Sequence, residues 1–381
     1  MKVIDLIAYK IEAYDSDDFI KDLSSNGVSY LVLLFNPVSG YSIVSNVVEN
    51  QKGKRKLLSG IVAKKNNWVF RTIFPLTFII DYILVSRKIS LLVRMYNPKN
   101  AFVDNTFIAL HFARLRRKSK INNLIYASHD WFDGGKKSLS FSNFLKHCFS
   151  YLFLIFDYYV CGSSDVVLNH TKLVQENRES YWGRSIIRKL EYLYKPHLTP
   201  ITSQQALSEC ENKNKIIFLG TATDSSGLEL TLNAINGTDY ELDIVGQLNK
   251  VVKNLIESNN INNFKYLGFC DRSIFNEIFS QSIVGINLIT SGDVHTVHTI
   301  PSKVVDYLRH GVPVICTKNI GPFAEVIVEY NIGIIIDPDK DEILKALYCI
   351  KSNNNFFVEN IKTFFEEYPF SNLIGYLELS K

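Results

Sequence analysis

The sequence has few cysteines for its length, and they are scattered. Six cysteines are spread over 381 residues, and no two of them form a CxxC pair or another spacing typical of metal ligands. Chains that depend on disulfides or on structural zinc carry their cysteines in paired spacings. We therefore exclude both frameworks and expect the six to be small buried residues in a reducing compartment.

Long apolar runs are also absent. A transmembrane helix needs about 20 consecutive apolar residues. The segment that comes closest, Trp68–Val85, is interrupted by Arg71, Pro75 and Asp81. The first residues, Met1–Tyr9, have the pattern of a strand and not that of a signal peptide. We predict a cytoplasmic protein that is not threaded through a membrane.

Acidic residues are scarce in the first half of the chain. Residues 1–200 hold 28 Lys+Arg against 16 Asp+Glu, a net +12, and residues 201–381 hold 14 against 22, a net −8. The basic excess lies in four clusters, which are Lys52–Lys56, Lys64-Lys65, Arg114–Lys120 and Lys136-Lys137. Such clusters attract anionic lipid headgroups. They predict peripheral contact with an anionic membrane, at the inner face of the cell membrane.

Two further features bear on this hypothesis. The segment Leu139–Tyr159 is rich in Phe, Tyr and Leu, which would add apolar area to a membrane contact. A helix packed in a core would have the same composition. The basic clusters come with no motif of nucleic-acid recognition, and the acidic second half opposes a polyanion partner. We therefore expect no nucleic acid.

The chain is long enough for two domains. A polar, proline-punctuated segment with little periodicity, Lys195–Asn214, predicts the linker between them. On both sides of it strand-like and helix-like segments alternate, which is typical of α/β folds with parallel sheets. We predict domains at 1–197 and 198–355, and a C-terminal segment, 356–381, whose helix Asn360–Leu379 returns to the first domain.

The alternating segments can be assigned individually. The predicted strands are Met1–Tyr9, Tyr30–Phe35, Lys88–Met95, Leu124–Ala127, Val160–Ser164, Ile216–Leu219, Glu241–Gly246, Lys265–Gly268, Ile283–Ile289, Val312–Thr317 and Gly333–Ile336. The predicted helices include Asn105–Lys118, Leu139–Tyr159, one that starts at Pro301, and Phe323–Tyr330.

The helix that starts at Pro301 carries the most specific signal. Proline is favoured in the first turn of a helix, where its missing N–H costs nothing. Lys303, Asp306 and His310 follow at helical spacing on one side. A helix N-terminus beside a lysine suits an anionic phosphate, and a carboxylate one turn later can accept hydrogen bonds from a sugar diol. An ordinary surface helix with solvated charges would carry the same three residues.

Several residues in and after this helix occur together in one known family: the run Asp306–Ile315 (DYLRHGVPVI), Glu325, Gly333 and the pair Asp337-Pro338. They resemble the donor-binding segment of GT-B glycosyltransferases, in particular the large retaining nucleotide-sugar family (group 1, family 4-like). The resemblance covers Lys215–Asp339 well and the N-terminal half loosely. It implies two Rossmann-like doubly wound domains facing a central cleft, with the acceptor on the first domain and the donor on the second.

The chain departs from that family at two places. The family carries two glutamates separated by seven residues; Asp306 falls on the second, which holds the ribose hydroxyls, and His298 falls on the first. The family also has a basic residue and a Lys-Gly pair after the glycine that corresponds to Gly220, whereas no basic residue follows here before Gly227. We expect Lys303 to supply the missing charge beside the donor diphosphate, with Arg272 as a second candidate.

The resemblance and the strand ends together predict the site residues. The catalytic candidates are His129 and Asp130, just past a predicted strand end, and Lys303; a helix cap and a structural histidine would explain the first two equally. The acceptor candidates are Ser39 and Gly40. The donor candidates are Gly220, Thr221, Asp271, Arg272, His295, His298, Thr299, Ile300, Pro301, Ser302, Lys303 and Asp306. We expect no metal and no cofactor, because no carboxylates accompany the two loop histidines.

These observations predict a hexosyltransferase. It would move a sugar from a nucleotide-diphospho-sugar to a glycan or lipid-linked saccharide in bacterial surface polysaccharide or glycoconjugate synthesis. Retention of anomeric configuration is implied by the resemblance. Two alternatives stay open. The departures at 298 and 306 favour a non-catalytic GT-B partner subunit or glycan-binding protein, and a nucleotide-sugar 2-epimerase would need a denser set of carboxylates.

Overall fold

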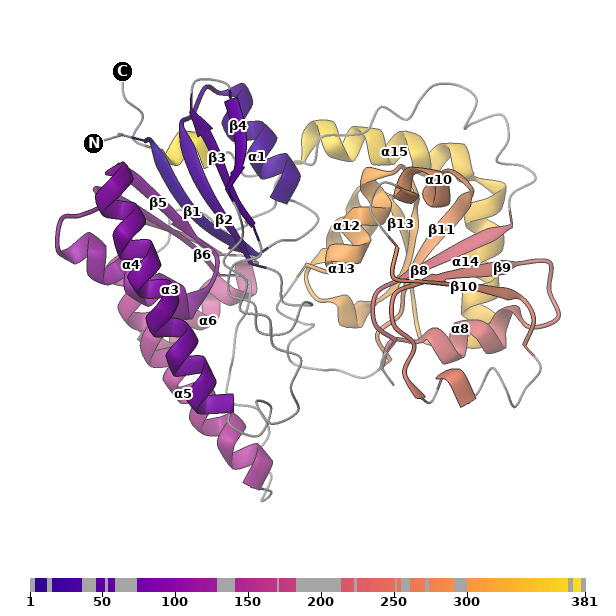
Figure 1. Cartoon of the computed structure of the whole chain (residues 1–381). Helices are drawn as coiled ribbons and strands as arrows, with labels where there is room; N and C mark the ends of the chain where they lie inside the picture. Colours follow the sequence, from indigo (N-terminus) through magenta and orange to yellow (C-terminus); the bar gives the residue numbers. More distant parts are fainter. Residues whose placement is uncertain are drawn as a thin grey trace. The chain divides into compact units, whose positions relative to one another are not determined.

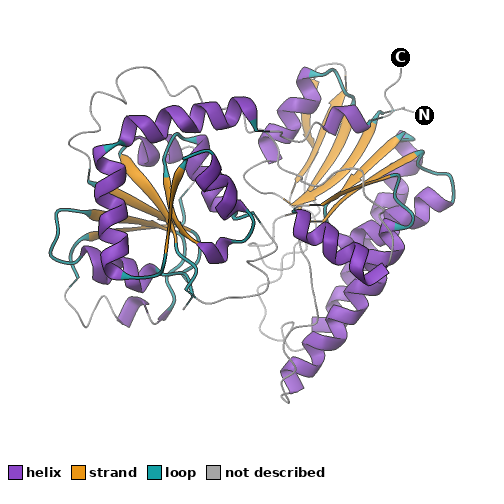
Figure 2. Cartoon of the chain, turned by 180° about the vertical axis from the view of Figure 1, so that it is seen from behind, coloured by secondary structure: helices purple, strands orange, loops and turns teal. Residues whose placement is uncertain are grey.

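The computed structural model describes most of the chain, in two compact units (Figure 1). One unit comprises Met1–Lys195 with Phe370–Lys381, and the other comprises Pro196–Pro369. Each unit contains one sheet with helices on both faces (Figure 2). The described residues are 4–11, 16–35, 46–51, 54–58, 74–128, 141–169, 171–182, 214–222, 225–250, 252–254, 261–270, 274–290, 300–368 and 373–377.

The N-terminal unit is built on a seven-stranded sheet of order β4-β3-β2-β1-β5-β6-β7. Five strands are parallel, and in chain order they follow 2-1-3-4-5, a doubly wound arrangement. The hairpin β3–β4 extends this sheet in antiparallel pairing with β2. The strands are β1 Leu6–Ile11, β2 Tyr30–Phe35, β3 Asn46–Gln51, β4 Lys54–Leu58, β5 Asn100–Val103, β6 Asn123–Ser128 and β7 Val166–Asn169.

Helices cover both faces of this sheet because successive strand residues point to opposite sides. In β1, Ile7 and Tyr9 enter one core, and Leu6 and Ala8 enter the other. The first core is covered by α3 (Phe74–Tyr96), α4 (Thr106–Arg117) and α5 (Phe141–Cys161). The second is covered by α1 (Ser16–Ser25) and by the short 3₁₀ helix η4 (Leu373–Tyr376). The helix α6 (Lys172–Trp182) follows β7.

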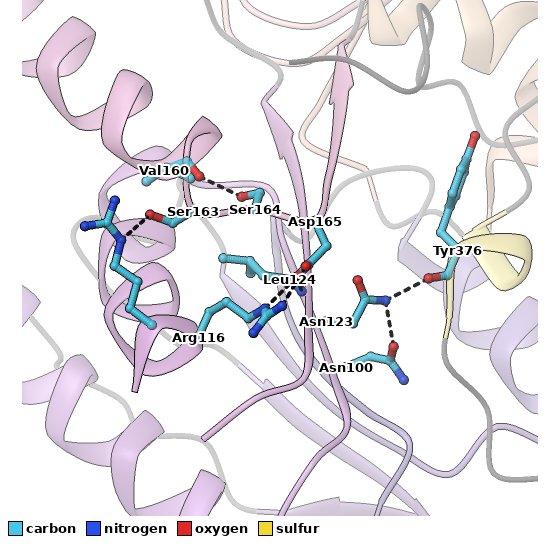
Figure 3. Close-up of polar contacts among 10 residues, drawn as sticks. Asn100, Arg116, Asn123, Leu124, Val160, Ser163, Ser164, Asp165 and Tyr376 are labelled. Carbon is cyan, nitrogen blue, oxygen red and sulfur yellow. Dashed lines mark hydrogen bonds and ion pairs between the residues drawn. The ribbon is translucent and has the colours of Figure 1, made fainter. Parts of the chain in front are cut away.

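Polar contacts join the amino end of β6 to the C-terminal segment and, through Asp165, to α4 (Figure 3). The amide of Asn123 donates to the side-chain oxygen of Asn100 and to the carbonyl of Tyr376, each at 2.8 Å. Asp165 accepts two hydrogen bonds of 2.7 Å from Arg116 and one of 2.8 Å from the backbone N–H of Leu124. These bonds tie the C-terminal segment and α4 to the sheet.

Two segments of this unit were predicted as strands, and both predictions are wrong. The segment Lys88–Met95 belongs to α3, and its apolar residues Ile89, Leu92 and Val93 are buried at helical spacing. The segment Val160–Ser164 is the end of α5 and the turn after it, where the two serine hydroxyls donate to helix carbonyls; the strand begins only at Val166. In both places a few apolar residues belong to a helix or its end, an ambiguity that periodicity over so few residues does not resolve.

The predicted C-terminal helix is also wrong in its extent. The helix α15 (Asn354–Glu367) ends before the segment that reaches the N-terminal unit, which is the separate element η4. Tyr368 is extended, with φ −62° and ψ 133°, because it precedes Pro369. The returning segment is therefore a short 3₁₀ helix rather than the end of a long α-helix.

The C-terminal unit is built on six parallel strands of order β10-β9-β8-β11-β12-β13. In chain order this is 3-2-1-4-5-6, the Rossmann arrangement. The strands are β8 Lys215–Leu219, β9 Glu241–Val245, β10 Phe264–Gly268, β11 Ser282–Asn287, β12 Val314–Thr317 and β13 Gly333–Ile336. The helices are α8 Leu228–Ile235, α10 Phe275–Ser280, α12 Ser302–Arg309, η3 Lys318–Ile320, α13 Phe323–Glu329, α14 Lys340–Ser352 and α15. The predicted α/β, doubly wound fold class is confirmed.

A tyrosine joins α12 to the middle of this sheet. Tyr307 is fully buried, and its hydroxyl accepts a 2.7 Å hydrogen bond from the backbone N–H of Leu219 and donates at 3.2 Å to the carbonyl of Ile286. The ring lies where a side chain on Gly285 would be, so that a Cβ on this residue would overlap the ring. The glycine therefore allows α12 to approach the sheet closely enough for Tyr307 to bridge β8 and β11.

We predict that Gly285→Ala destabilises the protein by about 1–3 kcal/mol, because the added methyl overpacks a closed contact. Denaturant unfolding followed by circular dichroism would measure this change. The matched control is Gly375→Ala, where an added Cβ meets nothing within 4 Å. This control should change the unfolding free energy by less than about 0.5 kcal/mol. Equal effects at both glycines would contradict the packing argument.

Candidate functional site

The strand order of the C-terminal unit determines where a ligand would bind. The order reverses between β8 and β11, which are neighbours in the sheet but not in the chain. In open parallel sheets, the loops that leave such a pair of strands diverge to opposite faces and open a crevice at the carboxyl ends. The residues at this position are Gly220 and Thr221 after β8, Leu288 to Thr290 after β11, and the amino ends of α8 and α12.

Two glycines shape the floor of this position. The N–H groups of Gly220 and Gly246 continue the ladder past the strand ends, to the carbonyls of Val245 (2.8 Å) and Gly268 (2.7 Å). A Cβ on Gly246 would overlap the carbonyl oxygen of Gly220, and φ of Gly246 is +127°. The two chain turns therefore lie in direct backbone contact, which a side chain on Gly246 would prevent.

The amino end of α12 brings a lysine to the same position. Helix geometry leaves the first backbone N–H groups without intrahelical partners, so those of Ser302 and Lys303 can bind a ligand. Val304 and Val305 already donate to the carbonyl of Pro301. The Lys303 ammonium lies 4.9 Å from the centre of the Phe218 ring and 4.0 Å from the place of a Cβ on Gly220. The lysine thus extends from α12 over the end of β8.

Lys303 is charged in surroundings that stabilise charge poorly. Burial lowers the pKa of its ammonium from 10.5 to about 8, and the nearby Cys316 thiol opposes this shift. The residue keeps some exposure, while protein atoms surround most of its charged end. Among the residues that the structure describes, none forms a hydrogen bond or ion pair with this ammonium. A buried cation without an anion is costly, so the position favours an anionic ligand.

A second group that can donate hydrogen bonds to a ligand, the side-chain amide of Asn287, lies at the end of β11. The side-chain amide nitrogen of Asn287 is buried and has no hydrogen-bond partner among the described residues. Asn287 is two residues after Gly285, so both lie on the sheet face that α12 covers. Its neighbour in register on β12 is Cys316, the residue that acts on the Lys303 pKa. A polar group and a cation therefore share one face at the same sheet edge.

Hydrogen bonds hold the chain that leaves β11. The hydroxyl of Thr317 donates to the carbonyl of Ile289 and accepts from its N–H, both at 3.0 Å, and the amide of Asn319 donates to the same carbonyl at 3.0 Å. The N–H of Thr290 donates to the carbonyl of Ser225 at 3.0 Å. These contacts hold the chain as far as Thr290. The two predicted histidines follow in residues 291–299, which lie outside the described residues.

Farther along α12 lie two more residues of the sequence pattern, Asp306 and His310. Asp306 is half-buried, one turn after Lys303. Its backbone carbonyl accepts a 2.7 Å hydrogen bond from Nδ1 of His310. The His310 ring stacks on Phe279, with 4.2 Å between ring centres. His310 therefore holds α12 against α10, and its presence in the sequence pattern has a structural explanation.

An exposed aromatic residue follows β10 at the same sheet edge. Phe269 is 72% exposed, directly after the strand. The hydroxyl of Tyr266, in β10, donates at 3.0 Å to the carbonyl of Gly246. This bond holds the end of β10 beside the glycine turn of β9. A large apolar ring that is open to solvent at a ligand-binding edge can stack on a flat ligand.

The structure brings several predicted donor residues together and does not describe others. Gly220 and Lys303 meet directly, and Thr221, Ile300, Pro301, Ser302 and Asp306 belong to the same two segments. Ser39, Gly40, His129, Asp130, Asp271, Arg272, His295, His298 and Thr299 lie outside the described residues. Sequence reasoning missed Gly246, Asn287 and Tyr307. The signal for Asn287 was present, because it is the one polar side chain in an otherwise apolar run, Ile283–Ile289.

In the N-terminal unit, a buried polar network precedes the predicted acceptor-side pair. Tyr126 of β6 donates to Asp157 at 2.6 Å and is contacted at 2.6 Å by the hydroxyl of Thr106. Arg178 of α6 donates to both oxygens of Asp157, at 3.0 and 2.9 Å, and also to Asn169. Burial and Asp157 raise the pKa of Tyr126 well above 10, so the tyrosine stays neutral. The network fixes the carboxyl end of β6 just ahead of residue 129.

The described part of the chain contains neither a cluster of metal ligands nor a membrane-spanning helix. Within it, no group of three or more His, Cys, Asp and Glu side chains is placed to hold a metal ion. None of the described helices combines the length and apolar character needed to span a bilayer.

The two doubly wound sheets are those of the GT-B fold. Residues 201–358 match the family described as Glycosyl transferases group 1. They form a glycosyl transferases group 1 domain, which confirms the resemblance and the enzyme class predicted from the sequence. No curated protein matches the sequence.

Solved structures match nearly the whole chain. HepE from Anabaena in complex with UDP superposes with a TM-score of 0.62 at 13% identity, over 96% of this chain and 95% of that chain. An α,α-trehalose-phosphate synthase (UDP-forming) from Burkholderia vietnamiensis gives 0.63 at 12% identity, over 96% of both chains. Sucrose-phosphate synthase from Thermosynechococcus elongatus gives 0.61 at 13% identity, over 95% of both chains. These matches confirm the predicted GT-B fold.

We predict that Lys303→Met stabilises the unliganded protein by about 1–3 kcal/mol at pH 7, since one pKa unit corresponds to about 1.4 kcal/mol. The folded pKa of about 8 lies below the ordinary 10.5. The folded state therefore binds fewer protons between these values, and wild-type stability should rise with pH across this window. The gain in unfolding free energy of Lys303→Met over the wild type should therefore decrease as the pH rises from about 8 to 10.5. Thermal unfolding from pH 7 to 10.5 measures both, with the exposed Lys318→Met as control; a Lys303→Met variant less stable than the wild type would contradict the burial argument.

Proposed function

We propose that the protein transfers a sugar from a UDP-sugar to a glycan or lipid-linked saccharide. The observation that carries this proposal is the Lys303 ammonium, which has no anionic partner among the described residues and lies over Gly220 at the strand-order reversal. The match of residues 201–358 to the family described as Glycosyl transferases group 1 supports this proposal. UDP is proposed because HepE is described in complex with UDP and with UDP-glucose, and an α,α-trehalose-phosphate synthase of the same fold is described as UDP-forming.

In this proposal the diphosphate occupies the space above Gly220. Lys303, the first N–H groups of α12 and the backbone around Gly220 and Thr221 would surround its oxygens. Negative charge grows on the leaving diphosphate as the glycosidic bond breaks, and groups held in advance at that position stabilise it more than they stabilise the bound donor. A lysine charge and helix N–H groups perform this task without a metal ion.

The nucleoside would lie at one end of the diphosphate, between α12 and the end of β10. Asp306, one turn along α12, would accept hydrogen bonds from the ribose hydroxyls, and Phe269 would stack on the base. Asp271, Arg272, His295, His298 and Thr299 remain proposed donor contacts from the sequence.

The acceptor side rests on the sequence and the sheet of the N-terminal unit. His129 and Asp130 follow the end of β6, where the buried network around Tyr126 holds the strand. We assign them to the sugar or to the acceptor hydroxyl, and Ser39 and Gly40 to acceptor binding. A lipid-linked acceptor in bacterial surface polysaccharide synthesis, retention of configuration and a peripheral location at the membrane complete the proposal.

One specific observation favours a second function, a non-catalytic GT-B partner subunit. His298 stands where the family has a glutamate, and the turn from Gly220 to Gly227 has no basic residue. A chain that had lost donor chemistry would be free to lose both. The buried charge of Lys303, which no described residue neutralises, argues against this function, because it destabilises a protein that binds no anion.

The two functions differ in nucleotide binding. Calorimetry of the full chain against UDP, GDP, CMP and dTDP, first without metal and then with magnesium, should show selective binding of UDP that magnesium does not require. The absence of binding to all four nucleotides would favour the partner subunit and contradict the proposed transferase.

The site assignment predicts two different kinds of loss. Lys303→Ala should abolish turnover, a loss of about 10²-fold or more by the order of magnitude known for oxyanion-stabilising groups. Asp306→Ala should mainly weaken UDP binding, by about tenfold for one charge-assisted hydrogen bond. Lys345→Ala is the matched control, because this exposed lysine of α14 pairs with Glu342 at 2.9 Å and is not among the residues assigned to the site. Turnover that is undiminished in the first two variants would remove the assignment.

A further inference from the structure

The N-terminal unit exposes large apolar side chains that sugar transfer does not use. Seven of them lie on two helices of the same layer, with exposed fractions between 43% and 59%. Single exposed apolar residues are ordinary, but a group on neighbouring helices marks an interaction surface. The seven are Ile83, Leu91 and Met95 on α3, and Tyr151, Leu152, Ile155 and Tyr158 on α5.

These residues form stripes and not a scatter. On α5, the exposed residues at 151, 152, 155 and 158 follow the spacing of one helix face, while Phe153 and Val160 are buried. On α3, the exposed residues at 83, 91 and 95 are separated by eight and four positions, which also share a face. Each helix is therefore apolar on the side that faces the sheet and carries further large apolar side chains on its outer side.

The two stripes face outward on the same side of the unit. The buried sides of α3, α4 and α5 all enter one core, so the three helices cover the same face of the sheet (Figure 1). The helix α4 packs against both others. Its arginines connect them: Arg114 reaches the hydroxyl of Tyr82, next to Ile83, and Arg117 lies 4.1 Å from the ring centre of Tyr159, next to Tyr158.

Charge on this outer surface has one sign. Within the described parts of α3, α4 and α5, every exposed charged residue is basic. The acidic residue of described α5, Asp157, is fully buried and bonded to Arg178. The exposed basic residues are Arg87, Lys88, Arg94, Arg114 and Arg117, with Lys118 and Lys120 directly after α4.

Apolar and basic residues alternate on this surface. Along α3, Ile83, Arg87 and Leu91 follow one another at four-residue steps, and Arg94 and Met95 continue the same side. Side chains of this kind suit the boundary of a bilayer, where apolar groups enter the acyl region and the cations contact phosphates. A second copy of the same surface is a poor partner, because a twofold contact would bring arginines against arginines.

We propose that the outer surface of α3, α4 and α5 binds an anionic phospholipid bilayer. The apolar stripes would enter the interface, and the arginines and lysines around them would contact lipid phosphates. This surface would hold the enzyme where a lipid-linked acceptor lies, but the inference does not depend on the donor site and fails or stands separately from it.

Flotation of the full-length protein with vesicles tests the proposal. Vesicles of phosphatidylcholine mixed with phosphatidylglycerol should bind the protein, and vesicles of phosphatidylcholine alone should bind it at least about tenfold less, because several charges contribute. Rising salt should weaken the binding. The variants Leu152→Glu/Ile155→Glu and Arg87→Glu/Arg94→Glu should each lower the bound fraction on anionic vesicles by about tenfold or more, on the order expected for charge reversal at a lipid surface.

The matched control places the same change on the other unit. Tyr348 and Phe356 are 71% and 54% exposed on α14 and α15, so Tyr348→Glu/Phe356→Glu adds two charges to exposed aromatic positions outside the proposed surface. This variant should bind vesicles like the wild type, and all variants should unfold at the wild-type temperature. The proposal is overturned if no vesicle binds, if the control loses binding equally, or if the surface variants convert a dimer to a monomer in light scattering.

Discussion

The proposed donor site depends on one cation, the Lys303 ammonium, held where water solvates it poorly. Lys303 extends from the first turn of α12 to a point 4.9 Å above the Phe218 ring, and burial lowers the pKa of its ammonium to about 8. Such a charge reduces stability unless an anion neutralises it. Its position at the strand-order reversal is the place where the fold itself opens a binding crevice. The buried charge that needs an anion and the position where the strand order favours ligand binding therefore coincide at Lys303.

The surrounding packing holds this charge in place. Tyr307 reaches through the sheet edge to Leu219 and Ile286, which Gly285 permits by having no side chain. The backbone contact of Gly246 with Gly220 holds the turn after β8 next to the ammonium. Structures that are only 12–13% identical share this whole fold, whereas the family match covers residues 201–358. Residues 201–358 thus keep a sequence pattern of the family that the N-terminal half does not show.

The sequence predicted those elements whose pattern and boundaries agree. Tyr30–Phe35 was predicted to the residue, because it is an apolar run that ends just before Asn36-Pro37. The strand predicted at Lys88–Met95 is wrong because this part of α3 contains the same apolar residue types as a strand. The position of Lys303 on α12 was predictable, but its place over Gly220 was not, since that contact joins residues far apart in the chain. Asn287 was visible only as a polar residue in an apolar run, and its unpaired amide required the packed structure.

The most direct test of the central claim is proton uptake when UDP binds. Calorimetry at about pH 8, in buffers of different ionisation enthalpy, reports the protons exchanged. An ammonium with a pKa of about 8 in the free protein is half protonated there, and a bound diphosphate would raise its pKa. We expect uptake of about half a proton per UDP in the wild type and none in Lys303→Met. UDP binding with no proton uptake, or with uptake that survives the substitution, would contradict the claim that Lys303 neutralises the diphosphate.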